Sequence, residues 1–131
     1  MLRIQTPLSD ELERLVTRTI GCCVAVHHEL GPGLLESVYA KAVRIELGVA
    51  GLTFESERAV PISYRGVYLC NQRLDLIVNE RIVLELNSVE RLGPVHRAQV
   101  LSYLRTTGLR IGLLVNFNVA VFQDGLRRII L

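Results

Sequence analysis

The sequence is poor in cysteine, and its three cysteines form no pattern that binds metal or builds a disulfide framework. Cys22 and Cys23 are adjacent and cannot bridge each other without severe strain, and the odd number leaves one thiol over. No pair has the spacing of a zinc site. Because Cys22 and Cys23 fall in a helical pattern, where small buried thiols are common, we expect the cysteines to be structural.

Long hydrophobic runs and an excess of one charge are also missing. No apolar stretch approaches the roughly 18 residues of a membrane span. Residues 1–10 lack a basic region followed by an apolar run, so no secretory signal is expected, and we predict a cytoplasmic protein with no membrane partner. The net charge of +2 neither favours nor excludes a nucleic-acid partner. Lys41 is the only lysine, so the basic residues are almost all arginine.

What the chain does contain is enough apolar side chains for one core. Of its 131 residues, 50% are hydrophobic, and this length predicts a single domain spanning residues 1–131. Apolar residues at helical spacing predict a first helix over residues 10–30, with Asp10 and Glu13 as a capping box. The glycines and proline of residues 31–33 must end it. A second helix follows over residues 34–51.

The rest of the chain predicts strands and one more helix. Residues 53–66, 67–80 and 81–89 read as successive antiparallel strands. Residues 93–108 predict a helix, residues 109–118 a buried strand, and residues 119–131 a short final strand or extended edge. The predicted fold class is therefore α/β, with a mixed β-sheet made of a three-strand antiparallel meander and one or two further strands, flanked by helices.

Two carboxylates interrupt the apolar strands. By strand alternation Asp75 shares a face with Arg73, and Glu85 shares a face with Asn87. A hairpin can bring Asp75 and Glu85 together, and carboxylates near an interior are costly unless a cation lies between them. Hard oxygen ligands suit Mg²⁺ or Mn²⁺. The alternative is a solvated sheet face, on which Asp75 pairs with Arg73 and Glu85 is exposed.

Polar residues also occupy two helices. Glu36 lies in the first turn of the second helix, where the helix dipole favours an acid, and Tyr39 shares its face. His96, Gln99 and Tyr103 form one polar stripe on the helix over residues 93–108. A solvated helix face explains this stripe equally well.

The order of four motifs suggests a family. The segments GPGLLESVY, RLDLIV, IVLELNSVE and PVHRAQVLSYLRTTGLRIGLLVNF follow one another as in GxxExxY proteins, and Gly33, Glu36 and Tyr39 match the signature that names them. Over roughly residues 20–130 the chain resembles the GxxExxY protein family, which is similar to the PD-(D/E)XK nuclease-like superfamily. The resemblance implies metal-dependent hydrolysis of phosphodiester bonds in DNA or RNA, with Mg²⁺ or Mn²⁺ as cofactor.

The resemblance also implies a role for each polar residue. Asp75 and Glu85 would be metal ligands, and Glu36 would hold a metal-bound water or a second ion. Gln99 and Tyr103 match the helix motif and would position the nucleic-acid backbone or the neighbouring acid, while Arg73 would contact phosphate. Three further side chains would act around the site through hydrogen bonds: His27, Tyr39 and His96.

Asn87 departs from the family pattern, which has lysine there. Asparagine can hydrogen-bond to water or phosphate but supplies neither a cation nor a base. Losing one such electrostatic group costs about 10²–10³ in rate. Arg73 could replace it, although arginine is a poor base; Lys41 lies about 140° round the helix from Glu36 and is a weaker candidate. Otherwise the metal alone supports slow hydrolysis, or the site is inactive.

Three functions therefore stay open at this point. The first is a metal-dependent nuclease. The second is a catalytically inactive nuclease-fold module that binds nucleic acid or a protein partner. The third is a self-associating structural protein, because a short chain that is half hydrophobic can leave an apolar face for a homodimer.

Overall fold

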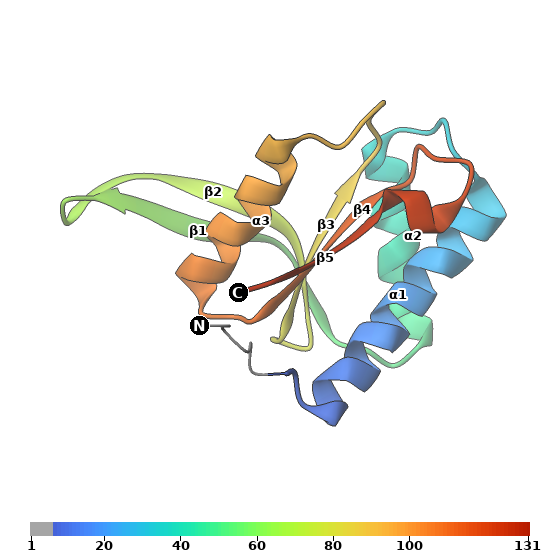
Figure 1. The fold of residues 1–131 in the computed structure, drawn as a ribbon, viewed down its shortest axis with the longest axis horizontal. Coiled ribbons are helices and arrows are strands. Elements are labelled where there is room, and N and C mark those ends of the chain that lie inside the picture. The colour runs from blue at the N-terminus through green and yellow to red at the C-terminus, as the bar shows by residue number, and fades with distance from the viewer. Residues whose placement is uncertain (1–6) are drawn as a thin grey trace, which may run out of the picture.

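A five-stranded mixed sheet with helices on both faces organises the molecule (Figure 1). The structure is a computed structural model, and it describes residues 7–131. In chain order its elements are α1 (Asp10–Leu30), α2 (Glu36–Val49), β1 (Phe54–Tyr64), β2 (Val67–Val78), β3 (Ile82–Asn87), α3 (Pro94–Thr107), β4 (Ile111–Asn116), the 3₁₀ helix η1 (Phe122–Gly125) and β5 (Leu126–Ile130).

The strands lie in the sheet in the order in which they occur in the chain. β3 and β4 are parallel, because α3 crosses between them, and the other neighbouring pairs are antiparallel. The predicted α/β class and mixed sheet are thus confirmed. None of the helices within residues 7–131 is long and apolar enough to cross a membrane.

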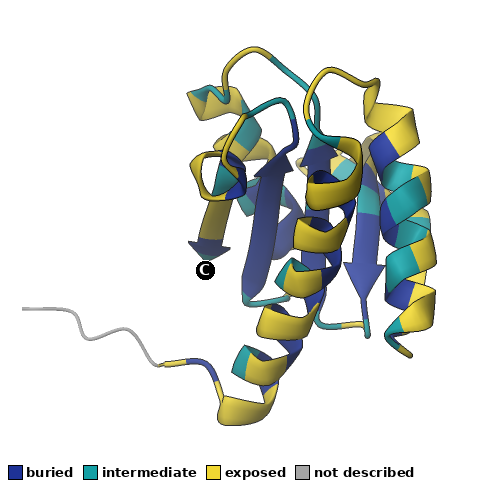
Figure 2. Ribbon diagram, turned by 90° about the vertical axis from the view of Figure 1, so that its right-hand side faces the viewer, coloured by how far each residue is buried: buried dark blue, intermediate teal, exposed yellow. Residues whose placement is uncertain are grey.

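Apolar side chains on the two faces of the sheet form two separate clusters. One cluster joins the sheet to α1 and α2, and the other joins it to α3. Figure 2 shows the result: the central strands are buried, while the helices turn exposed residues outward. β3 follows the predicted alternation, with Leu84 and Leu86 on the α1–α2 side and Val83 on the α3 side.

The start of α1 differs from the prediction. The N-cap is Ser9, whose Oγ accepts a hydrogen bond from the N–H of Leu12 at 3.1 Å. Asp10 is instead the first helical residue, and the carboxylate of Glu13 forms an ion pair with Arg128 on β5. The predicted capping box is therefore wrong. The cause is that Ser9, one residue earlier, caps the helix, which leaves Glu13 outside the capping position and free to pair with Arg128.

β1 and β2 extend well beyond the rest of the sheet. β2 pairs with β3 only through residues Leu76, Ile77 and Val78, whereas its pairing with β1 continues to the turn. Arg65 and Gly66 have positive φ values of 52° and 78°, as a two-residue hairpin turn requires. We call residues 58–73 the β1–β2 ribbon; it projects at the left of Figure 1.

Candidate functional site

The site begins where β2 separates from β3. The backbone ladder between the two strands ends at the pair Leu76–Leu84. Beyond it, the N–H of Asp75 donates to Oε1 of Glu85 at 2.9 Å, and the N–H of Leu86 donates to Oδ2 of Asp75 at 2.9 Å. Carboxylate oxygens therefore take the place of backbone carbonyls as acceptors, and this brings Asp75 and Glu85 together.

Burial and mutual repulsion shift the ionisation of this pair. Burial, with a further contribution from the charge of Asp75, raises the pKa of Glu85 to about 8. Burial also raises the pKa of Asp75, although the hydrogen bond from Leu86 opposes the shift. Neither carboxylate takes part in any of the ion pairs formed within residues 7–131. Two half-buried acids thus share a place that has no basic partner.

Glu36, in the first turn of α2, lies close enough to Asp75 for their charges to interact. The residue as a whole is exposed, but partial shielding of its carboxyl group and the charge of Asp75 raise the pKa of Glu36. His96 acts in the opposite direction, so Glu36 lies within electrostatic reach of both residues.

The turn before Glu36 is held by two side chains. The hydroxyl of Tyr39 donates to the carbonyl of Gly31 at 2.5 Å and accepts from the N–H of Leu34 at 3.1 Å. The ring of Tyr39 stacks on Phe117, with centroids 4.5 Å apart. Ser88, directly after β3, donates to the carbonyl of Leu34 at 2.6 Å. Ser88 thereby ties the start of α2 to the end of β3. This role of Ser88 was not predicted from the sequence.

α3 contributes Tyr103, Gln99 and His96 from the other side. The hydroxyl of Tyr103 donates to the carbonyl of Arg73 at 3.0 Å, and burial together with the charges of Glu85 and Asp75 raises the pKa of Tyr103. Nδ1 of His96 accepts from the N–H of Gly93 at 2.9 Å and closes the first turn of α3. Gln99 is exposed one turn further along.

The Arg73–Asp75 pair of the alternative, solvated-face interpretation does not occur. The Arg73 guanidinium lies 4.0 Å from the carboxylate of Glu57, and both side chains are exposed. Glu57 lies across from Asp75 on β1, between the pairs Ser56–Leu76 and Arg58–Leu74, and its charge adds to the raised pKa of Asp75. Glu57 was missed because the register of β1 against β2 cannot be read from either strand alone.

His27 packs between α1 and the segment after β4, whereas Asn87 ends the strand that carries Glu85. Nε2 of His27 lies 2.7 Å from the carbonyl oxygen of Val119, and its ring meets Phe122 edge-on, so it joins α1 to the segment after β4. Asn87 is the half-buried last residue of β3, paired with Asn116 of β4. By strand alternation Asn87 faces the same side as Glu85, and it brings no charge there.

The donor chemistry of the site fits a hard divalent ion held by few protein ligands. Within residues 7–131, no three His, Cys, Asp or Glu side chains stand arranged as a metal-binding group. Asp75 and Glu85 can offer two carboxylates, and Mg²⁺ commonly binds through one or two carboxylates while keeping several waters. The unpaired acids and this ligand number agree, so the residues fit such an ion.

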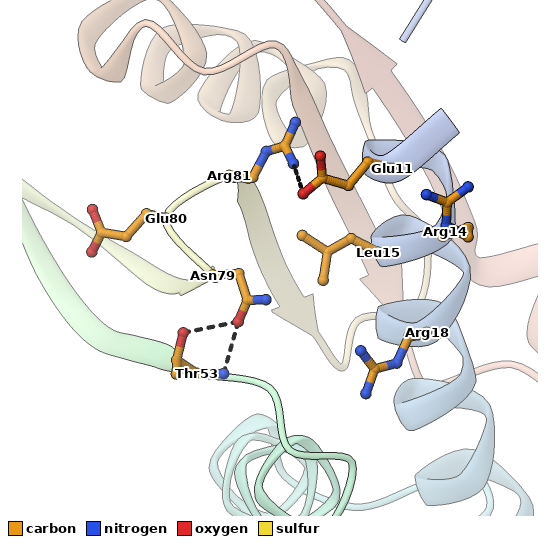
Figure 3. A pocket seen from close by; sticks show the side chains of 8 residues that line it. All are labelled: Glu11, Arg14, Leu15, Arg18, Thr53, Asn79, Glu80 and Arg81. Carbon is orange, nitrogen blue, oxygen red and sulfur yellow. Dashed lines mark hydrogen bonds and ion pairs between the residues drawn. The ribbon is translucent and has the colours of Figure 1, made fainter. Parts of the chain in front are cut away.

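A pocket of about 500 Å³ lies elsewhere, beside the turn that precedes β3 (Figure 3). Arg81 there lies 3.3 Å from the Glu11 carboxylate, and Oδ1 of Asn79 accepts two hydrogen bonds from Thr53. None of the predicted site residues lines this pocket. Two of its charged residues, Glu11 and Arg81, already pair with each other. The shape of the surface alone would therefore indicate this pocket and not the site of Asp75 and Glu85.

The mixed sheet with its crossover helix is consistent with a nuclease-like α/β fold. A family model described as the PD-(D/E)XK nuclease superfamily matches residues 13–129, and the chain belongs to this superfamily. Members of the superfamily typically use divalent metal ions. Neither a search of curated proteins nor a search of solved structures found a significant match.

Proposed function

We propose that the protein is a divalent-metal-dependent nuclease that hydrolyses phosphodiester bonds of DNA or RNA slowly. The observation that carries the proposal is the pair Asp75 and Glu85, which is half-buried, held by backbone hydrogen bonds and left without a basic partner in the described chain. Within the superfamily, the GxxExxY signature at Gly33, Glu36 and Tyr39 supports the narrower affiliation.

The positions of the acids support a role for each. Asp75 and Glu85 would hold Mg²⁺ or Mn²⁺, and Glu36 would hold a metal-bound water or a second ion. A bound ion supplies a Lewis acid that lowers the pKa of water and offsets charge on phosphoryl oxygens. Gln99, exposed on α3, positions the nucleic-acid backbone. Tyr103 fixes the base of the β1–β2 ribbon through the carbonyl of Arg73.

Asn87 is the reason for slow hydrolysis. It can orient a water or a phosphate oxygen by hydrogen bonding, but it cannot accept a proton or stabilise the charge that develops in the transition state. Arg73 can contact phosphate, but it does not supply the missing base, because its guanidinium stays protonated. Lys41 is exposed on α2, five residues beyond Glu36 and on another side of that helix.

The second candidate is an inactive nuclease-fold module that binds nucleic acid or a protein partner. The observation that favours it is the same neutral Asn87 beside acids whose pKa values are raised. In that case Glu85 stays largely protonated at neutral pH, because its pKa is raised to about 8, and the fold serves binding alone.

A cleavage assay separates the two candidates. Wild type, Asn87→Lys and Asp75→Ala are incubated with Mn²⁺ and labelled single-stranded and duplex DNA and RNA. We expect slow cleavage by wild type, cleavage about 10²–10³-fold faster by Asn87→Lys, and none by Asp75→Ala. Gln123→Lys, which adds the same charge at an exposed position of η1, is the control and should match wild type.

Two other outcomes would contradict slow hydrolysis by the wild-type protein. Cleavage by Asn87→Lys but not by wild type supports the inactive module. If neither cuts and titration detects no Mn²⁺ binding, the metal site itself is refuted.

A further inference from the structure

The β1–β2 ribbon is the least covered part of the sheet. β2 leaves β3 after Leu76, so beyond that point the ribbon is two strands wide and both of its edges are open. Its residues are mostly exposed, although Val60 near its base is buried against the α3 cluster. An isolated two-stranded hairpin is only marginally stable in water, so the length of this ribbon needs an explanation.

The ribbon carries positive charge and no acid. Arg58, Arg65 and Arg73 lie within residues 58–73, and that range contains no aspartate or glutamate. Arg58 lies 3.7 Å from Glu55, and Arg73 lies 4.0 Å from Glu57, in exposed pairs at the ribbon's base. Such pairs contribute little and exchange readily for phosphate. Arg65, at the tip, forms no ion pair within the described chain.

Two tyrosines stand at the tip with their rings in solvent. Tyr64 is 67% exposed and Tyr68 is 58% exposed. Tyr64 pairs with Val67, and Tyr68 pairs with Ser63 in the next rung, so the two rings lie on opposite faces of the ribbon. Exposed aromatic rings beside arginines are the features on which unpaired bases stack, whereas the bases of a duplex are already stacked on one another.

The ribbon leads directly to the acidic site. Asp75 follows Arg73 on β2, and the hydroxyl of Tyr103 holds the carbonyl of Arg73 in place. At about 3.3 Å per residue, the tip residue Val67 lies roughly 26 Å along the strand from Asp75. A strand of nucleic acid on the ribbon would therefore be directed towards the acids.

We propose that the β1–β2 ribbon binds an unpaired stretch of the nucleic-acid substrate, with Tyr64 and Tyr68 stacking on bases and Arg65 contacting phosphate. This rests on the proposed function for nucleic acid as the partner, and it deepens it by naming single-stranded substrate. A second copy of the chain fits the ribbon less well. Pro61 disfavours the addition of another strand at the β1 edge, and the register shift that leaves Leu69 of β2 unpaired interrupts the other edge.

Binding is measured by fluorescence anisotropy with a labelled single strand and its duplex, at low salt and in EDTA, so that no cleavage occurs. Tyr64→Ser/Tyr68→Ser should weaken single-strand binding at least tenfold and leave duplex binding unchanged. Tyr64→Phe/Tyr68→Phe keeps the stacking rings and should bind as wild type does. Arg65→Ala should lower the slope of log affinity against log salt by about one. Arg14→Ala, on the exposed face of α1, is the matched control and should change nothing.

Equal single-strand affinity for wild type and Tyr64→Ser/Tyr68→Ser would overturn the ribbon proposal, as would a wild type that binds no single strand. A wild-type dimer that Tyr64→Ser/Tyr68→Ser dissociates, with nucleic-acid binding unchanged, would assign the ribbon to a second copy instead. Because binding is measured without metal, it is independent of the cleavage assay. Ribbon-dependent binding without cleavage contradicts the proposed hydrolysis alone, and cleavage with ribbon-independent binding contradicts the ribbon alone.

Discussion

At the scale of single residues, the carboxylates of Asp75 and Glu85 have two effects: they accept backbone hydrogen bonds between β2 and β3, and they repel each other. One oxygen of each carboxylate accepts a backbone N–H where the ladder between β2 and β3 stops. This hydrogen bond compensates for some of the cost of burial, but it does not remove the repulsion between two acids. Without metal, Glu85 is therefore more stable protonated than ionised at neutral pH.

The first residue-scale prediction concerns the stability of the metal-free protein against pH. The folded pKa of Glu85, about 8, lies above the ordinary value of 4.5. Folding therefore takes up a proton in this window, and the free energy of unfolding falls as pH rises from about 4.5 to about 8. Glu85→Gln should reduce this fall and stabilise the protein at pH 8, on the order of 2 kcal/mol. Urea unfolding in EDTA at several pH values measures it.

Glu13→Gln is the control of opposite sign. The hydrogen bond and charge of Arg128 lower the pKa of Glu13, so its contribution is present above the unfolded pKa and is lost as pH falls through the folded pKa. Glu13→Gln should therefore lower stability at neutral pH and have less effect in acid. A Glu85→Gln variant that keeps the wild-type slope would refute the burial argument.

How far each site residue could be predicted depends on whether its interactions are local in the sequence or involve distant residues. Asp75 and Glu85 stand out because each is a carboxylate that interrupts an otherwise apolar strand. Glu57 and Ser88 gave no such signal, since their importance comes from the strand register and from a turn far away in the sequence. Alternation offered Asp75 as the partner of Arg73 in the alternative, solvated-face interpretation, yet the neighbouring strand supplied Glu57.

At the scale of elements, the packing of α3 on β4 depends on one missing side chain. Gly112 lies opposite Val83, and a Cβ added there would be 2.4 Å from Cγ1 of Val100. Both valines are fully buried, so neither can move freely. Gly112→Ala should lower the free energy of unfolding by about 1–3 kcal/mol, measured by denaturant titration.

Gly48→Ala is the matched control on a helix. An added Cβ at Gly48 of α2 meets nothing within 4 Å, and the residue is exposed. Alanine has the higher helix propensity, so this variant should raise stability by up to about 1 kcal/mol. A stabilised Gly112→Ala variant would mean that α3 can move away from the sheet without loss.

The elements themselves were largely readable from local patterns. The left-handed C-cap Gly108 and the start of α3 at Pro94 follow from glycine and proline alone. The ribbon was not readable, because strand-like residues say nothing about which neighbour they pair with. β2 is long enough to pair with β1 throughout, but only its last residues also pair with β3.

At the scale of the whole molecule, three separately packed parts meet at the acids. α2 brings Glu36 from the face covered by α1 and α2, while α3 brings Tyr103 from the other face. β2 and β3 supply the central pair between them. An ion bound there would connect both layers, so its binding should be visible in the stability of the entire fold.

The last prediction uses this coupling. A ligand that binds only the folded state stabilises it by about 2.7 kcal/mol at 100 times its Kd. Mn²⁺ should therefore raise the Tm of wild type by several degrees at pH 8. The shift should be smaller at pH 5, because protons compete for acids whose pKa values are raised. Asp75→Ala should abolish the shift, whereas Asp124→Ala, an exposed acid of η1, should keep it. Differential scanning calorimetry with and without Mn²⁺ measures these Tm shifts. Equal shifts in wild type and Asp75→Ala would show that Mn²⁺ binds elsewhere.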